Sequence, residues 1–195
     1  NVTLDDQTLF KYAFEFESHP DNLAAALYGG LIAAGVSDDG KVLVSRLRVS
    51  EGASGVVVIP AFELSTEKAR SVLPKSYSRA DAVYNIQRSA LTIAALTTGN
   101  WPLLRDSMKD KIHQPYRAPL IPGLEAILQL ETPGLLGIAL SGAGPTVFAI
   151  AAPERAAAVG EAVAGVFAKF GVSATPHLVH IDQSDRKSTR LNSSH

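Results

Sequence analysis

Two blocks of the sequence carry side chains suited to binding a small charged molecule. The first is His19-Pro20-Asp21-Asn22, where an imidazole, a carboxylate and an amide precede an alanine-rich run. The second is Ser141-Gly142-Ala143-Gly144, a turn of small residues between two apolar segments. Glycine permits positive φ and leaves the backbone open, so the turn can form an anion-binding concavity from its amides. An ordinary hairpin turn has the same composition and stays an alternative.

Two arginines are candidates for binding a carboxylate, because a planar guanidinium donates two parallel hydrogen bonds to it. Arg70 follows Thr66 by four residues on an expected helix, so the two side chains share a face. Arg117 lies in Pro115-Tyr116-Arg117-Ala118-Pro119, which we expect to be a proline-bracketed loop. Solvated arginines, or arginines paired with surface carboxylates, are the alternative at both positions.

The elements that position these residues follow from apolar periodicity and turn residues. Helical spacing predicts helices over 22–27, 65–73, 79–98, 123–131 and 154–170. Strand patterns predict a hairpin from 31–34 and 42–49, a buried strand at 56–59, a hairpin over 134–151 and a last strand at 173–181. We expect Asp21 or Asn22 to cap the first helix. One helix-rich crossover between two halves of an antiparallel sheet favours an α+β fold of the split βαβ or ferredoxin-like kind.

Composition excludes several classes of partner and site. Lys and Arg number 18 against 19 Asp and Glu, which argues against a nucleic-acid or anionic membrane surface. Cysteine is absent, so disulfides and thiolate metal sites are excluded and a cytoplasmic location is expected. No apolar run approaches the roughly 20 residues of a membrane helix. His177 and His180 should point to opposite faces of a strand, so we expect no metal site there.

Four blocks, in order, resemble the homoserine kinases, a branch of the GHMP family of small-molecule kinases. They are His19 to Asn22, Asn85 to Arg88, His113 to Pro119 and Ser141 to Pro145, and the resemblance runs from about Leu4 to Ile181. It implies that 1–52 is the end of an N-terminal ribosomal-S5-like domain. It also implies that 53–183 is a ferredoxin-like GHMP kinase C-terminal domain. Independently of the resemblance, 184–195 is polar, aperiodic and rich in Ser, Arg and Asn, so we expect a disordered or foreign tail.

The resemblance further implies a reaction, in which ATP with Mg²⁺ phosphorylates the side-chain hydroxyl of L-homoserine in threonine biosynthesis. A homodimer is a further expectation. The implied substrate-binding residues are His19, Asp21, Asn22, Thr66, Arg70 and Arg117. Asp21 would be the catalytic residue, orienting the attacking hydroxyl and accepting its proton late. The phosphate region would be closed by the loop of Ser141, Gly142, Ala143 and Gly144. We expect Arg88 to bridge a helix to a loop. We expect His113 to pack against its neighbours or to form a hydrogen bond.

The sequence departs from the family in one respect. The Gly-Leu-Gly-Ser-Ser-Ala loop that holds triphosphate in the family is not present. Because the chain opens at Asn1 in what reads as a helix in progress, we expect it to be the C-terminal two thirds of a longer kinase, inactive by itself. Two alternatives stay open. Another GHMP kinase would act on a different alcohol, although two arginines are unneeded for a sugar, and a non-catalytic amino-acid-binding regulatory module would leave the His-Pro-Asp-Asn block unexplained.

Overall fold

The computed structural model describes residues 8, 10, 12, 14 and 20–183. The chain divides into two compact units, Asn1–Val49 with Ile181–His195, and Ser50–His180. The predicted tail, 184–195, lies outside the described residues, and the predicted domain limits stay predictions. In the part of the chain that is described, no helix is long and apolar enough to cross a membrane.

The first unit contains helix α2 (Pro20–Tyr28) and a hairpin of β1 (Leu31–Val36) and β2 (Val42–Leu47). Its core is formed by Phe10, Ala24 and Leu27, and the rings of Phe14 and Tyr28 stack on Phe10. The two strands pair antiparallel over their full length, as predicted.

The start of α2 differs from the prediction. The helix already includes Pro20, whose fixed φ suits the first helical turn. Asp21 and Asn22 therefore lie within the first turn instead of capping it, and both are exposed to solvent.

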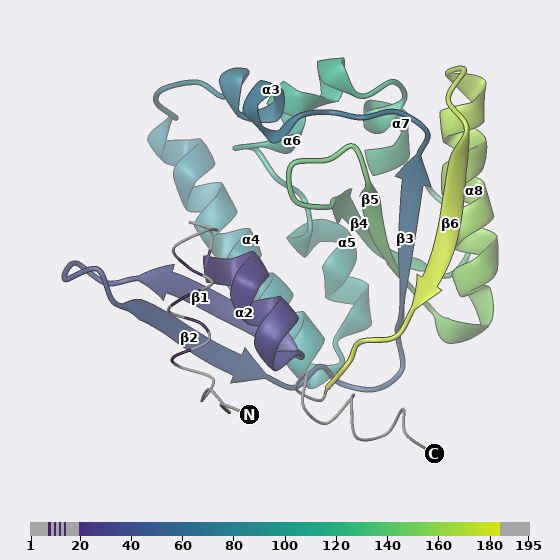
Figure 1. The fold of residues 1–195 in the computed structure, drawn as a ribbon. Helices are drawn as coiled ribbons and strands as arrows, with labels where there is room; N and C mark the ends of the chain where they lie inside the picture. Colours follow the sequence, from purple (N-terminus) through teal and green to yellow (C-terminus); the bar gives the residue numbers. More distant parts are fainter. Residues whose placement is uncertain (1–7, 9, 11, 13, 15–19, 184–195) are drawn as a thin grey trace, which may run out of the picture. The chain divides into compact units, whose positions relative to one another are not determined.

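The second unit is built on a four-stranded antiparallel sheet in the order β4-β5-β3-β6 (Figure 1). The strands are β3 (Ser54–Pro60), β4 (Leu135–Leu140), β5 (Val147–Ala151) and β6 (Ala174–Val179). The strand that comes first in the unit pairs with the third and the fourth, which is the strand order of a split βαβ fold. The predicted α+β class and ferredoxin-like sheet are confirmed.

The long helix of this unit begins and ends where its sequence predicts. Helix α4 (Arg79–Thr98) is capped by Ser78, whose hydroxyl accepts a hydrogen bond from the amide of Asp81, and Gly99 ends it in a left-handed conformation. The other helices are α3 (Thr66–Ser71), η1 (Trp101–Leu103), α5 (Leu104–Ser107), α6 (Gln114–Arg117), η2 (Ala118–Leu120), α7 (Leu124–Leu128), η3 (Pro153–Arg155) and α8 (Ala156–Lys169).

The segment 113–119, expected to be a loop, is helical. Gln114–Arg117 forms one turn of α-helix, and Ala118–Leu120 continues it as a 3₁₀ turn. Pro115 and Pro119 both occupy early helical positions, where the missing N–H of proline leaves no helical hydrogen bond unmade. The prolines begin two short helical turns here instead of bracketing a loop.

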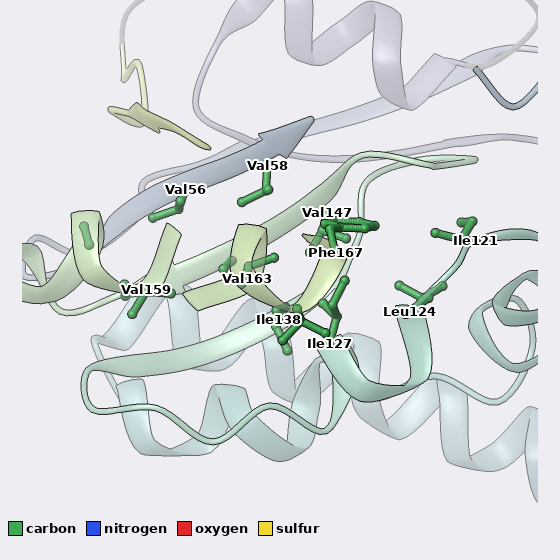
Figure 2. Packing of buried hydrophobic residues seen from close by; sticks show 14 of the residues in the cluster. Val56, Val58, Ile121, Leu124, Ile127, Ile138, Val147, Val159, Val163 and Phe167 are labelled. Atoms are coloured by element: carbon green, nitrogen blue, oxygen red, sulfur yellow. The ribbon is translucent and has the colours of Figure 1, made fainter. Parts of the chain in front are cut away.

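The core of the second unit lies between one face of the sheet and α8. Val56 and Val58 on β3 face Val159, Val163 and Phe167 on α8, and all five are buried (Figure 2). Ile121, which follows η2, and Leu124 and Ile127 of α7 belong to the same buried cluster (Figure 2). Burial of apolar surface of this kind is the main favourable contribution to folding. It holds the sheet in place, and the loop that connects β4 to β5 extends from this sheet.

Helix α8 approaches the sheet closely at Gly160. A Cβ atom at this position would lie 2.8 Å from Cβ of Pro176 on β6 and 3.1 Å from Cγ1 of Val56 on β3. Gly165, on the same helix, has open space at the corresponding point. The chain therefore provides a matched pair of helical glycines, of which only one is needed for packing.

We predict that Gly160→Ala and Gly165→Ala will differ in stability. Alanine at 165 should raise the free energy of unfolding by up to about 1 kcal/mol, because alanine favours a helix over glycine. Alanine at 160 gains the same propensity but overpacks the helix against the sheet, so it should be about 1–3 kcal/mol less stable than the 165 variant. Urea unfolding of both variants measures the difference, and equal stabilities would contradict the close approach.

Candidate functional site

The predicted site residues are divided between the two units. Asp21 and Asn22 lie on α2 of the first unit, and His19 lies outside the described residues. The remaining candidates all belong to the second unit, where they come from α3, α6 and the loop between β4 and β5. The structure brings these three elements of the second unit together.

The loop between β4 and β5 is a tight turn over 141–146. The amide of Ser141 donates to the carbonyl of Thr146 over 2.8 Å, and the amide of Gly144 donates to the carbonyl of Ser141 over 2.9 Å. Gly142 and Gly144 have φ of 55° and 85°, in the left-handed region that favours glycine. Within the described residues, the amides of Gly142 and Ala143 have no backbone acceptor. Ser141 and Gly142 are exposed, so the loop presents a hydroxyl and two amides to a ligand.

Arg117 links this loop to α3. Its side chain is buried, with 8% exposed, and its Nε donates to the carbonyl of Ala69 on α3 over 3.1 Å. Nη1 donates to the carbonyl of Gly142 over 2.9 Å. Among the described residues, Nη2 of Arg117 donates no hydrogen bond. Arg117 thus holds two backbone segments while one guanidinium nitrogen remains for a ligand.

Arg70 adds a second positive charge beside Arg117. It lies on α3 with Thr66, and both side chains are exposed. Burial lowers the pKa of Arg117, and the positive charge of Arg70 lowers it further, while Asp110 and Tyr77 raise it. Two neighbouring cations repel each other, so an anion that binds between them relieves this repulsion. The shared face of Thr66 and Arg70 and the nearby Arg117 are together suited to a small carboxylate.

Gln114 holds the other end of the same loop. Its side chain is buried, and Oε1 accepts a hydrogen bond of 2.7 Å from the amide of Leu140, the last residue of β4. Helix α6 therefore contacts the loop at two points, through Gln114 before the turn and through Arg117 within it.

Asp110 in turn holds the start of α6. Its carboxylate accepts hydrogen bonds from the amides of Ile112, His113 and Gln114 and from the side-chain amide of Asn85 on α4. The Asn85 side chain also accepts from the amide of Lys111 over 2.9 Å. We expected Arg88 to bridge the helix to the loop, but Asn85 makes this bridge. The Cζ atom of Arg88 lies 4.3 Å from the centre of the Tyr84 ring, in a cation–π contact.

The charge of Asp110 is stabilised by these donors. Burial raises the pKa of Asp110, but the hydrogen bonds from His113, Asn85 and the backbone amides outweigh burial and hold the pKa well below its usual range. His113 Nδ1 lies 3.3 Å from the carboxylate, in agreement with the hydrogen-bonding role expected of it. Sequence reasoning missed Asp110 and Gln114. The available signal was position, because Asp110 precedes the His113 to Pro119 block by three residues, where a carboxylate can cap a helical turn, and Gln114 lies within the block.

Comparison with known proteins assigns the second unit to a family. Residues 92–169 match the family described as GHMP kinases C terminal. The chain is 48% identical over 170 residues to homoserine kinase of Aquifex aeolicus, which covers 87% of this chain and 57% of that protein. It is 42% identical over 180 residues to homoserine kinase of Desulfitobacterium hafniense, covering 92% of this chain and 60% of that protein. The chain belongs to the GHMP kinase family.

The solved structure of a homoserine kinase agrees with this assignment. The crystal structure of homoserine kinase from Cytophaga hutchinsonii superimposes with a TM-score of 0.84 at 28% identity, covering 93% of this chain and 60% of that one. Galactokinase of Lactococcus lactis has a TM-score of 0.59 at 16% identity, which indicates a shared fold alone. This GHMP kinase chain spans about three fifths of the length of the two curated relatives named above.

We predict that Asp110→Asn will remove an acid-sensitive part of the stability of this GHMP kinase chain. The folded pKa of Asp110 is depressed, so its contribution is fully present above the unfolded pKa of about 4 and is lost as the pH falls below that value. The variant should be less stable than wild type at pH 7 by roughly 1–3 kcal/mol, since amide donors lose their acceptor.

Urea unfolding between pH 7 and pH 3 measures this difference, which should narrow as the pH falls. Asp106→Asn is the matched control, because Asp106 is an exposed carboxylate in the same segment that pairs with Lys109. A difference between Asp110→Asn and wild type that is constant over this pH range would show that Asp110 carries no depressed pKa.

Proposed function

We propose that the protein to which this chain belongs is an ATP-dependent homoserine kinase. It would transfer a phosphoryl group to the side-chain hydroxyl of L-homoserine, giving O-phospho-L-homoserine for threonine biosynthesis. The observation that carries the proposal is the pairing of Arg70 and Arg117 beside a loop with unused amides, in a GHMP kinase chain. Homoserine kinases among the relatives, at 42% to 48% identity, support the same substrate.

The two arginines would bind the carboxylate of the amino acid. Arg117 offers Nη2, and Arg70 lies on the exposed side of α3 with the Thr66 hydroxyl. A pair of cations suits a carboxylate better than the uncharged hydroxyls of a sugar, because only an anion offsets their mutual repulsion. This argument favours homoserine over a sugar substrate.

The loop at 141–144 would contact the transferred phosphate. The amides of Gly142 and Ala143 and the Ser141 hydroxyl are donors that suit phosphate oxygens. ATP with Mg²⁺ supplies the γ-phosphoryl group when bound. The described residues include no group of three or more His, Asp or Glu side chains suited to a metal ion. Mg²⁺ would enter the site together with the phosphates of ATP. A homodimer and a cytoplasmic location stay predictions.

Asp21 would act at the hydroxyl of the substrate, and this role rests on the resemblance of the His19 to Asn22 block. Phosphoryl transfer needs alignment more than a strong base. We propose that Asp21 orients the hydroxyl and accepts its proton as the oxygen–phosphorus bond forms and the bond to ADP breaks. His19 and Asn22 would fix the position of the substrate.

The experiment uses a chimera in which this chain is joined to the part of the Aquifex aeolicus kinase that it does not match. ADP release should depend on homoserine. Arg70→Gln should raise KM for homoserine roughly 10- to 100-fold, the effect of one lost charge-assisted hydrogen bond. KM for ATP should stay within about twofold, since Arg70 would bind only the carboxylate.

Lys68→Gln is the matched control, because it removes an exposed positive charge from the same helix. It should leave both constants close to those of wild type. ADP release with galactose or mevalonate but not with homoserine would show a different GHMP kinase. Homoserine binding by calorimetry without any ADP release would favour the regulatory module.

Asp21→Asn tests the role of the carboxylate. If Asp21 accepts the proton, kcat of the chimera should fall about 100-fold or more while KM for homoserine changes little. Asp38→Asn, in the exposed turn of the β1–β2 hairpin, is the control for loss of an acidic side chain in the same unit. Near-normal kcat in Asp21→Asn would rule out the proton-accepting role and leave orientation alone.

A further inference from the structure

We infer that Gln114 and Asp110 are positioning residues of this GHMP kinase, which hold Arg117 and the 141–144 loop where substrate binds. The inference rests on the proposed function for what the site binds, but the contacts themselves are independent of it. Neither residue was among the site candidates from the sequence, and neither needs to touch substrate.

The argument begins with the shortness of α6. A helix of four residues forms too few internal hydrogen bonds to be stable by itself. Its position must therefore come from outside contacts. At its start, Asp110 accepts from the amides of His113 and Gln114, and Asn85 ties Asp110 to the long helix α4.

Packing alone does not fix α6 either. A cavity of about 330 Å³ opens beside it, lined among others by Tyr84, Met108, Gln114, Pro115 and Ile138. Interiors without such voids resist displacement because side chains interdigitate closely. Because this pocket leaves one side of α6 without close packing, the hydrogen bonds at the ends of α6 contribute strongly to its position.

The far side of α6 meets the loop through two buried polar side chains. Gln114 Oε1 accepts from the amide of Leu140, and Arg117 Nη1 donates to the carbonyl of Gly142, so the loop is held on both sides of Ser141. Displacement of α6 would shift Nη2 of Arg117 and the loop amides together. Asp110 and Gln114 thus act through Arg117 and the loop.

The charge of Asp110 contributes in a second way. It faces Arg117 closely enough to raise the pKa of that guanidinium, while Arg70 lowers it. Asp110 therefore partly offsets the repulsion between the two arginines in the absence of substrate. Among the described ion pairs, Asp110 forms no salt bridge with Arg117, so Nη2 of Arg117 stays available for the substrate carboxylate.

Gln114→Met tests the inference, because methionine keeps the length of the side chain but provides no comparable acceptor. In this chain, hydrogen exchange measured by mass spectrometry should quicken at least 10-fold in peptides covering 138–144, while peptides of α8 keep their protection. In the chimera, KM for homoserine should rise about 10-fold or more, because Nη2 of Arg117 shifts with α6. Gln114→Glu keeps an acceptor and should restore slow exchange in the loop.

Gln129→Met is the matched control, since Gln129 is an exposed glutamine on the wall of the same cavity. It should match wild type in both measurements. A merely structural role of Gln114 would lower the folded fraction, reducing apparent kcat with KM unchanged, and this result would overturn the inference. Unchanged loop exchange in Gln114→Met would overturn it as well.

Two further outcomes separate the inference from the proposed function. If the wild-type chimera releases no ADP with homoserine, the proposed function fails, and the exchange experiment still decides whether Gln114 holds the loop. If the wild-type chimera is active and Gln114→Met retains its KM for homoserine, the inference fails alone. Should Gln114→Met not fold, Gln114→Asn replaces it, because the shorter amide cannot reach Leu140.

Discussion

The buried guanidinium of Arg117 is the contact on which the candidate site depends. It joins the carbonyl of Ala69 on α3 to the carbonyl of Gly142 in the loop, two segments that share no strand or helix. A buried cation is costly unless donors and neighbouring charges compensate it. Here the two carbonyls and the charge of Asp110 provide that compensation. Arg117 therefore holds the two segments of the candidate site together, and in the proposed function it also binds the substrate carboxylate.

The electrostatic arrangement around Arg117 explains why two arginines can lie close together in an unliganded protein. Arg70 is exposed to water, which screens its charge, whereas Arg117 is buried beside a carboxylate. The two guanidinium groups still repel each other, and an anion bound between them would remove this repulsion. Such preorganised charge costs little reorganisation when a ligand binds. The same arrangement would bind an uncharged alcohol poorly.

Local sequence signals were sufficient for the elements of regular length. Helix α4 begins after Ser78 and ends at Gly99 because a capping hydroxyl and a glycine stand at its ends, and both were readable. The hairpins and the ferredoxin-like order followed from apolar, strand-like runs separated by turn residues. Helix α6 was missed because one turn has no periodicity to detect and its prolines suggested a loop. The contact between Gln114 and Leu140 joins residues 26 positions apart, so spacing within a motif could not reveal it. His19, Asp21 and Asn22 remain candidates from the resemblance alone.

The pairing of the central strand imposes an order on the assembly of the second unit. Strand β3 is synthesised early in this unit, whereas its partner β6 is synthesised last. Val57 of β3 pairs with His177 of β6, which lies 120 residues further along the chain. During synthesis on the ribosome, one edge of β3 therefore stays unpaired until almost the whole unit has emerged. Contacts of such large sequence separation slow folding, and an open strand edge can pair with another chain in the meantime. The interval before β6 is synthesised is therefore the one in which the nascent chain is most exposed to wrong pairing.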